Sequence, residues 1–254
     1  MWPAGLRCPA GSRTASGGRP KPDDRLAVRA ELRVARALQF VGATMVAMVS
    51  RSTDAPVPLG EFVPMADQRI LLRGLDWAGY QSLIAMRGDR RSPRIAYLDG
   101  VAELMAPSRN HDGIKSVLGC LVEAYCTERE IAWTPYGSWL VDDESEEAGL
   151  EPDECYIFGP DPKAVALPEL AIEVVWTSGG INKLEIYRRL GIGEVWFWKD
   201  DAIQVFRLGP DGYHQHAESG CLPGIDLALL CRLALITPVS AAVAELRAKL
   251  HRGA

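Results

Sequence analysis

The sequence predicts an α/β fold in which helices flank a mixed central sheet. Strand-like and helix-like segments are mixed along the chain rather than strictly alternating, so a doubly wound nucleotide-binding fold is not expected. The chain contains no internal repeat, no phosphate-loop motif and no dinucleotide glycine fingerprint. Its 254 residues are 48% hydrophobic and 24% charged, a composition typical of a globular protein with a sizeable core.

The chain is expected to divide into an extension over residues 1–48, a main domain over residues 70–235 and a C-terminal helix over residues 236–254. The first 22 residues are rich in Gly, Pro, Ser and Arg and contain no acidic residue, which favours disorder. The apolar stretch Ala37–Val49 has 13 residues, fewer than the roughly 20 that a membrane span needs. A translation start at Met45 or Met48 is the alternative explanation for the composition of the extension.

Charge and cysteine content favour a cytoplasmic protein with an acidic body. The net charge is -5; the first 44 residues hold eight basic and three acidic residues, which leaves 20 basic and 30 acidic residues in the remainder. This balance weighs against a broad nucleic-acid-binding surface, although a local basic patch is compatible with it. The six cysteines show no C-x-x-C pair and no zinc-finger spacing, so we expect reduced thiols.

The first elements predicted are a short helix and a β-hairpin. Asp76 can cap a helix that runs to about Arg87, because its side chain can accept from the free amides of the first turn, and Gly88 ends the helix. In the segment Arg94–Met105, the dipeptide Asp99-Gly100 separates two apolar arms. This arrangement indicates a hairpin, since both turn residues tolerate positive φ.

A long amphipathic helix is predicted over His111–Glu130, where apolar residues recur at helical spacing. Four more strands are expected, with the acidic run Asp142–Glu147 as a solvated loop between them. The strands are Ile131–Trp133, Ser138–Val141, Pro152–Phe158 and Leu170–Trp176. The later elements are a helix over Ile181–Leu190 ended by Gly191, a hairpin over Glu194–Leu208, an edge strand within Gly212–Ser219 and a helix over Val239–Leu250.

Glu173 places a carboxylate in an otherwise apolar strand. The run Leu170–Trp176 has no polar alternation, which is typical of a strand covered on both faces. A carboxylate there faces a desolvation cost on the order of several kcal/mol unless a cation or donors compensate it. On the following helix, Lys183 falls inside the apolar arc. Lysines are almost never fully buried without a partner, so we expect Lys183 to pair with Glu173.

Asp153 is the second candidate. It follows Pro152 at the start of a predicted strand and points as a half-buried residue would. Two strands side by side could bring Asp153 and Glu173 together as an oxygen site for Mg²⁺ or Mn²⁺. Such an ion would polarise a phosphodiester and activate a water, while Lys183 stabilised charge or positioned the water. Alternatively, Glu173 and Lys183 form a structural ion pair and Asp153 only begins a strand.

Six segments of the sequence, in this order along the chain, carry a resemblance to a known family: Tyr97–Glu103, Ala106–Asp112, Gly149–Tyr156, Leu170–Ser178, Lys183–Trp198 and Leu222–Asp226. Together they resemble the Uma family, bacterial proteins classed as restriction endonucleases of the PD-(D/E)xK nuclease superfamily. The resemblance covers roughly Leu75 to Arg232. It implies a restriction-endonuclease-like core in which Asp153 matches the motif aspartate and Glu173 the second acidic residue.

The sequence departs from the superfamily pattern at two positions. Val175 stands where the superfamily lysine would fall, and Lys183 matches the place on the next helix from which the family supplies it. Ala96 stands where many relatives carry a glutamate, which leaves a third acidic ligand open, with Glu103 as a candidate substitute.

Two further groups of residues have expected roles. His111 and Asp112 match a pair in the relatives; His111 could contact a phosphate or the metal shell, or be a capping or solvated histidine at a helix start. Trp176, Trp196 and Trp198 are expected to pack in the core or on a sheet face rather than stack on bases.

The resemblance implies a Mg²⁺-dependent endonuclease that acts on DNA, with Asp153, Glu173 and Lys183 as catalytic residues. A homodimer is compatible with cutting two strands at two sites. The alternative is a catalytically inactive nuclease-fold module that binds nucleic acid or a protein partner, which the acidic body and Ala96 favour.

Overall fold

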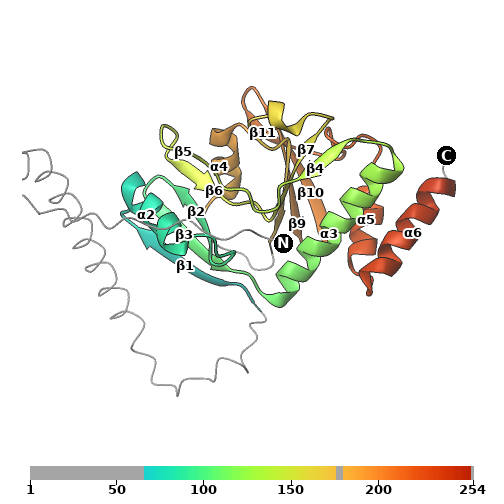
Figure 1. Ribbon diagram of the computed structural model, residues 1–254, viewed down its shortest axis with the longest axis horizontal. Coiled ribbons are helices and arrows are strands. Elements are labelled where there is room, and N and C mark those ends of the chain that lie inside the picture. The colour runs from blue at the N-terminus through green and yellow to red at the C-terminus, as the bar shows by residue number, and fades with distance from the viewer. Residues whose placement is uncertain (1–65, 176–179, 253–254) are drawn as a thin grey trace, which may run out of the picture. The chain divides into compact units, whose positions relative to one another are not determined.

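The computed structural model of the chain describes residues 66–175 and 180–252 (Figure 1). All of them belong to one compact unit that spans residues 61–254. The expected extension over residues 1–48, with its apolar stretch, lies outside the described residues. None of the helices in the two described ranges combines the length and the hydrophobicity that crossing a membrane requires.

The α/β class is confirmed, and a mixed six-stranded sheet forms its centre. Its order is β11-β10-β9-β8-β7-β4, and every neighbouring pair is antiparallel except β8 and β9, which are parallel. The strands are β4 (Trp133–Pro135), β7 (Glu154–Phe158), β8 (Leu170–Val174), β9 (Glu194–Lys199), β10 (Ala202–Gly209) and β11 (Gly212–His216). Helix α4 (Lys183–Leu190) lies in the crossover between the two parallel strands, as parallel pairing requires.

A second sheet, which the sequence did not predict as a separate unit, lies beside the first (Figure 1). It is antiparallel with the order β1-β3-β2-β6-β5. Its strands are β1 (Gln68–Arg73), β2 (Arg94–Leu98), β3 (Val101–Ala106), β5 (Val141–Asp143) and β6 (Ala148–Leu150). Helix α2 (Trp77–Arg87) packs on this sheet through Tyr80, whose ring stacks on that of Tyr97.

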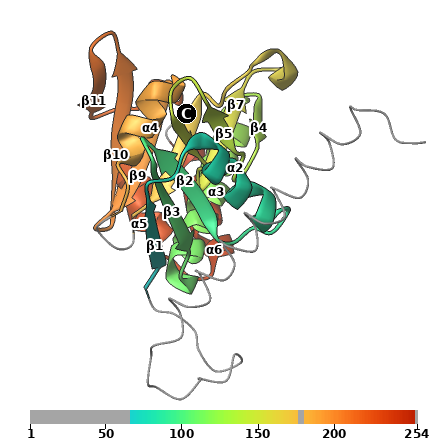
Figure 2. The same ribbon diagram turned by 90° about the vertical axis from the view of Figure 1, so that its left-hand side faces the viewer.

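The helices divide between the faces of the six-stranded sheet (Figures 1 and 2). Helix α3 (Arg109–Glu128) contacts β8, helix α5 (Leu227–Ala234) contacts β10, and α6 (Val239–Arg252) packs on both helices. Helix α4 contacts β11 and three strands of the second sheet, so it lies between the two sheets. The 3₁₀ turn η1 (Pro162–Ala164) lies between β7 and β8.

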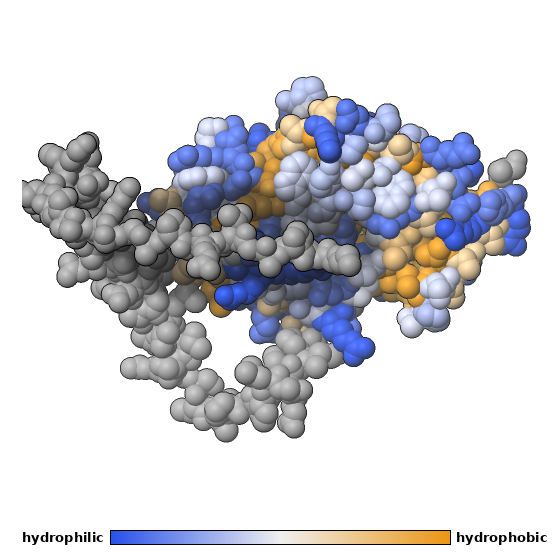
Figure 3. All heavy atoms as spheres, in the orientation of Figure 1, coloured by the Kyte–Doolittle hydropathy of each residue, from blue (hydrophilic) through white to orange (hydrophobic). Residues whose placement is uncertain are grey.

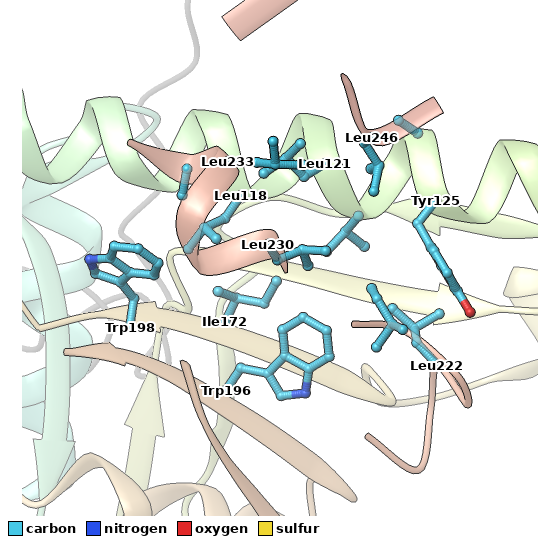
Figure 4. Close-up of a cluster of buried hydrophobic side chains, with 14 of the residues drawn as sticks. Leu118, Leu121, Tyr125, Ile172, Trp196, Trp198, Leu222, Leu230, Leu233 and Leu246 are labelled. Carbon is cyan, nitrogen blue, oxygen red and sulfur yellow. The ribbon is translucent and has the colours of Figure 1, made fainter. Parts of the chain in front are cut away.

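The main core lies between α3, α5 and the six-stranded sheet. Figure 4 shows Trp196, Trp198 and Ile172 of the sheet facing leucines of the two helices. Both tryptophans are at most 1% exposed. The prediction that they pack in the core is therefore confirmed, whereas Trp176 lies outside the described residues.

Most predicted turns and caps have the expected geometry. Asp76 Oδ1 accepts from the Gly79 amide at 2.8 Å and so caps α2. The hairpin residues Asp99 and Gly100 have φ of 46° and 79°, as a turn with two positive-φ residues requires. Gly191 ends α4 in the left-handed region with φ of 75°.

Two predicted strands begin later than expected. Glu130 has φ of 55°, and the Ile131 amide donates back to the Cys126 carbonyl at 2.9 Å, so the end of α3 occupies the start of the strand predicted at Ile131. Strand β4 begins at Trp133 and contains Pro135, which is tolerated because β4 is an edge strand. Similarly, β5 begins at Val141 rather than Ser138.

The predicted acidic loop is partly strand. Asp142 and Asp143 pair with β6, and only Glu144–Glu147 form the turn of the β5–β6 hairpin. Four elements have no counterpart among the predictions: strands β1 and β6, the 3₁₀ turn η1 and helix α5. Asp226 caps α5 by accepting from the Leu229 amide at 2.8 Å, a cap signal that was visible in the sequence.

The surface carries hydrophobic areas among charged ones. Figure 3 shows hydrophobic surface over the α5–α6 end of the molecule, where Leu235 is 56% exposed and Val239 is 37% exposed. The five cysteines within the described ranges are free thiols, and burial is the main cause that raises the pKa of Cys155 to about 12.

Candidate active site

Glu173 lies near the end of β8, an interior strand of the six-stranded sheet. All five residues of β8 are buried. Ile172 and Val174 belong to the core beneath α3, and Ala171 to a separate cluster beneath α4. The strand is thus covered on both faces, as predicted. Because side chains alternate along a strand, Glu173 shares the α4 face with Ala171.

Helix α4 supplies two donors to the Glu173 carboxylate. Lys183 Nζ lies 2.5 Å from Oε2, which confirms the predicted pairing, and the Tyr187 hydroxyl donates to Oε1 at 2.5 Å. The two donors stand four residues apart and therefore on the same face of the helix. Burial, followed by the neighbouring Glu173 charge, raises the pKa of Tyr187 well above its ordinary value, so its hydroxyl stays protonated.

Asp153 lies beside the end of β8. Strands β7 and β8 are antiparallel with Glu154 opposite Ile172, so Asp153, the residue before β7, comes next to the Glu173–Val174 backbone. Its Oδ2 accepts from the Val174 amide at 2.6 Å. The Asp153 side chain is fully buried, and it is therefore not turned to solvent.

Two cationic or polar groups from other elements also meet Asp153. Arg94 of β2 forms an ion pair with Oδ1, and Nε2 of His111 on α3 lies 2.9 Å from Oδ2. Asp153 therefore joins three elements: the six-stranded sheet, the five-stranded sheet and the start of α3. Its two oxygens are both occupied by partners within the protein.

Glu103 is a third buried carboxylate near this region. Strand register places Glu103 of β3 directly opposite Ala96 of β2, and directly paired residues project on the same side of a sheet. Glu103 thus stands on the face where the resemblance expects a glutamate at position 96. It is 1% exposed and accepts from the Ile181 amide at 3.1 Å, at the entry to α4.

The residues fit a hard divalent ion in donor type. Asp153 and Glu173 offer carboxylate oxygens, the ligands that Mg²⁺ prefers. In the two ranges that the structure describes, no group of three or more His, Cys, Asp or Glu side chains is arranged as a metal site. A metal at these two carboxylates would have to displace protein donors that they bind here.

His111 occupies a different position from a solvated helix-start histidine. Its side chain has no exposed surface, and its Nδ1 lies 3.1 Å from Oδ2 of Asp67, on the segment before β1. Both ring nitrogens are therefore engaged by aspartates, and neither is open to a phosphate.

Sequence reasoning missed three residues of this site. Tyr187 had a visible signal, since it follows Lys183 by one helical turn on the packed face. Asp67 and Arg94 had none, because their partners His111 and Asp153 lie 44 and 59 residues further along the chain.

A comparison with protein families covers the whole of this site except Asp67. The Uma2 family, described as a putative restriction endonuclease, matches residues 77–234. The chain belongs to the Uma2 family. A search of curated proteins found no matching relative. The Uma2 match includes Asp153, Glu173 and Lys183, as well as Glu103, Arg94 and His111.

Proposed function

We propose that this Uma2 protein is a metal-dependent endonuclease that hydrolyses phosphodiester bonds in DNA. The observation that supports the proposal is that the buried Asp153 binds the backbone next to Glu173 at the end of β8, where Glu173 binds Lys183. Asp153 accepts from the amide that follows Glu173, and Lys183 lies 2.5 Å from Glu173. The endonuclease description of the family supports the same chemistry.

Each residue has a distinct role in this proposal. Asp153 and Glu173 would hold Mg²⁺ or Mn²⁺, and the bound ion would polarise the phosphodiester and activate a water. Lys183, whose side chain is 16% exposed, would stabilise negative charge on the phosphate or position the water. Tyr187 would keep the Glu173 carboxylate in place, because its hydroxyl donates to the oxygen that Lys183 leaves open.

Arg94 must release Asp153 Oδ1 before that oxygen can bind a metal. The released guanidinium would lie beside the site and could pair with a phosphate oxygen, as arginine does in bidentate geometry. The metal would then replace Arg94 as the positive partner of Asp153. The carboxylate can therefore be fully paired without the metal and still bind the metal for the reaction.

The test is cleavage of supercoiled plasmid in Mg²⁺ or Mn²⁺ by the full chain and by Asp153→Asn and Lys183→Met. The asparagine is chosen because alanine at 153 would remove both oxygens that Arg94 and His111 Nε2 contact. Both variants should lose cleavage by at least about a hundredfold, since each removes a group that acts on the reacting phosphate. Arg129→Ala, at the far end of α3, serves as the matched surface control.

The proposal fails if the parent protein leaves plasmid intact in both metals, or if Asp153→Asn cuts at the parent rate. Circular dichroism and thermal melting of each variant separate lost chemistry from lost folding. We also propose a cytoplasmic location, where DNA is accessible. Cutting both strands favours a homodimer, which sedimentation would detect.

A second candidate function is a nuclease-fold module that binds nucleic acid or a protein partner without turnover. The full pairing of both carboxylates by Arg94, His111, Lys183 and Tyr187 favours it, together with Ala96 and the acidic body. Calorimetric titration with Mn²⁺ separates the candidates. A catalytic site should bind the ion and lose it in Asp153→Asn, whereas an inactive module has no need of such a site.

A further inference from the structure

His111 joins two aspartates that lie far apart in the sequence. Its Nδ1 faces Asp67 Oδ2 at 3.1 Å and its Nε2 faces Asp153 Oδ2 at 2.9 Å. All three side chains have zero exposed surface. A ring held at both nitrogens cannot rotate without breaking a contact, so the orientation of His111 is fixed by Asp67 as much as by Asp153.

Asp67 is itself firmly held. Its Oδ1 accepts from the backbone amide of Ser108 at 2.9 Å. Burial would raise the pKa of Asp67, but hydrogen bonds from His111 and Ser108 outweigh it and lower the pKa to about 2. Asp67 is therefore an anion at neutral pH. Ser108 in turn caps α3, since its hydroxyl oxygen accepts from the His111 amide at 3.2 Å.

Asp153 depends on side-chain contacts for its orientation because it precedes β7 and lies outside the strand ladder. Its Oδ2 is shared between the Val174 amide and His111, and its Oδ1 faces Arg94. If Arg94 leaves when a metal binds, His111 is the side chain that still orients the carboxylate. The position of His111 then depends on Asp67.

We propose that Asp67 and His111 are positioning residues that orient the Asp153 carboxylate for metal binding, with Asp67 acting through His111. This inference rests on the proposed function. It extends the site beyond the matched family region, because Asp67 lies ten residues before residue 77, where the match begins. Neither residue contacts the reacting phosphate in this role.

The test is calorimetric titration of the full chain with Mn²⁺ alone, using the parent, Asp153→Asn, Asp67→Asn and His111→Gln. Asparagine at 67 can still accept from the Ser108 amide but lacks the charge that holds His111. Removing a group that orients a metal ligand typically weakens affinity or activity about 10–100-fold, so Asp67→Asn and His111→Gln should each weaken Mn²⁺ binding about tenfold or more. In plasmid cleavage measured over a range of DNA concentrations, kcat should fall, while the KM for DNA should stay unchanged.

Asp226→Asn is the matched control. Asp226 also holds the start of a helix through one backbone amide, that of Leu229, but it is exposed and belongs to α5. Asparagine caps a helix about as well as aspartate, so Asp226→Asn should change neither stability nor Mn²⁺ affinity appreciably. Equal Mn²⁺ affinity in Asp67→Asn and the parent, with only a loss of stability in Asp67→Asn, would overturn the inference.

A double variant tests whether Asp67 acts through His111. Asp67→Asn combined with His111→Gln should bind Mn²⁺ no more weakly than His111→Gln alone, whereas independent effects would add. If Asp67→Asn does not fold, His111→Gln decides the orientation role by the same titration. A parent protein without an Asp153-dependent Mn²⁺ site overturns the proposed function together with this inference. A site that is lost in Asp153→Asn but intact in His111→Gln overturns the inference alone.

Discussion

Buried carboxylates are compensated in two different ways in this protein. Glu194 accepts hydrogen bonds from four neutral donors within 3.2 Å: the Trp196 indole, the Ser219 hydroxyl and the amides of Gly220 and Cys221. Its nearest cation, Arg207, lies further away, at 3.9 Å. Glu173 instead faces an ammonium and a phenol from α4. Neutral donors are sufficient for Glu194, whose carboxylate only anchors a loop. The flexible side chain of Lys183 can instead leave Glu173 and bind a phosphate.

The contribution of the Glu173–Lys183 ion pair to the free energy of unfolding can be measured by replacing one partner or both. Lys183→Met leaves a buried carboxylate without its cation and should lower the free energy of unfolding by about 3 kcal/mol. The double variant Glu173→Gln with Lys183→Met should recover most of that loss, because no charge remains buried. Urea denaturation gives both values. If the single variant is as stable as the parent, the ion pair contributes nothing to the fold.

Asp67 gives a pH dependence whose sign follows from its pKa. The pKa is lowered from 3.8 to about 2 in the folded protein, so folding favours the ionised form. The resulting stabilisation is complete above about pH 4 and is lost as pH falls toward 2. Asp67→Asn should therefore be less stable than the parent by about 1–2 kcal/mol at pH 6, and this gap should close near pH 2.

The measurement is urea denaturation of both proteins between pH 2 and pH 7. Taking the difference removes the contributions of the other carboxylates, which titrate in both proteins. A gap that stays constant across this range would show that the Asp67 charge does not take part in stability. A gap that widens in acid would contradict the direction of the pKa shift.

The sequence predicted the contacts of the site between residues close together in the chain, but not those that depend on the packing of distant segments. Lys183 and Glu173 lie ten residues apart on adjoining elements, and the conflict between charge and apolar surroundings identified them as partners. Arg94 is one of several arginines in its segment, and only the packing of two sheets brings it to Asp153. No local pattern distinguishes such a residue from a solvated one.

At the scale of elements, the entry to α4 determines where Lys183 lies. Gly180 has φ of +118°, and a Cβ built on it would lie 2.1 Å from Oε2 of Glu103. The next amide, that of Ile181, donates to the same oxygen. Arg189, further along α4, pairs with Asp99 in the β2–β3 turn. Helix α4 is thus fastened to the second sheet at both of its ends.

Gly180→Ala should disturb this attachment. A side chain at this φ costs about 1–3 kcal/mol, and the clash would displace Glu103 or the start of α4. We expect a lower melting temperature and slower DNA cleavage, because Lys183 shifts relative to Glu173. Gly113→Ala is the control: Gly113 lies in α3 with nothing within 4 Å of a built Cβ, so alanine should stabilise the helix by about 0.5–1 kcal/mol. Equal effects of the two changes would contradict this account.

Elements with local signals were predicted well, and those that depend on distant pairing were not. The Asp99-Gly100 turn and the Asp76 cap fixed a hairpin and a helix from a few residues each. Strand β1 has exposed Ile70 and Leu71 in an irregular burial pattern, and it is a strand only because β3 pairs with it. Alternation of apolar and polar residues reveals a strand that has one buried face, and the edge strand β1 has no such face.

At the scale of the whole molecule, the arrangement of two sheets was not accessible from the sequence. The acidic run Asp142–Glu147 was predicted as a solvated loop, yet it lies in the β5–β6 hairpin, which adds two strands to the sheet that contains the β2–β3 hairpin. Pairing of Tyr97 with Gly149 joins segments 52 residues apart, and no local propensity encodes it. The site lies where the two sheets meet, and Arg94 was missed because only this packing brings it to Asp153.

The proposed cleavage of DNA by an acidic protein requires a local basic surface beside the site. The segment before β2 offers one: Arg90 and Arg91 are exposed, and neither takes part in a side-chain hydrogen bond or ion pair among those of the described residues. Arg94, three residues later, reaches Asp153. At no more than about 3.6 Å per residue, the Arg91 backbone lies within roughly 11 Å of that of Arg94. DNA bound at the site would therefore pass close to both arginines.

Arg90→Ala with Arg91→Ala, made in the cleavage-deficient Asp153→Asn background, should weaken duplex DNA binding. Each lost phosphate contact lowers the slope of log K against log salt by about 0.9, so the double change should lower it by roughly 2 for any DNA sequence. Fluorescence anisotropy across a salt series measures the slope. Arg129→Ala is the control, because this exposed arginine ends α3 about 27 Å along the helix from His111. Arg129→Ala could change the slope by half as much as the double change, which is the same effect per arginine. In that case the effect comes from net charge, and DNA does not bind beside β2.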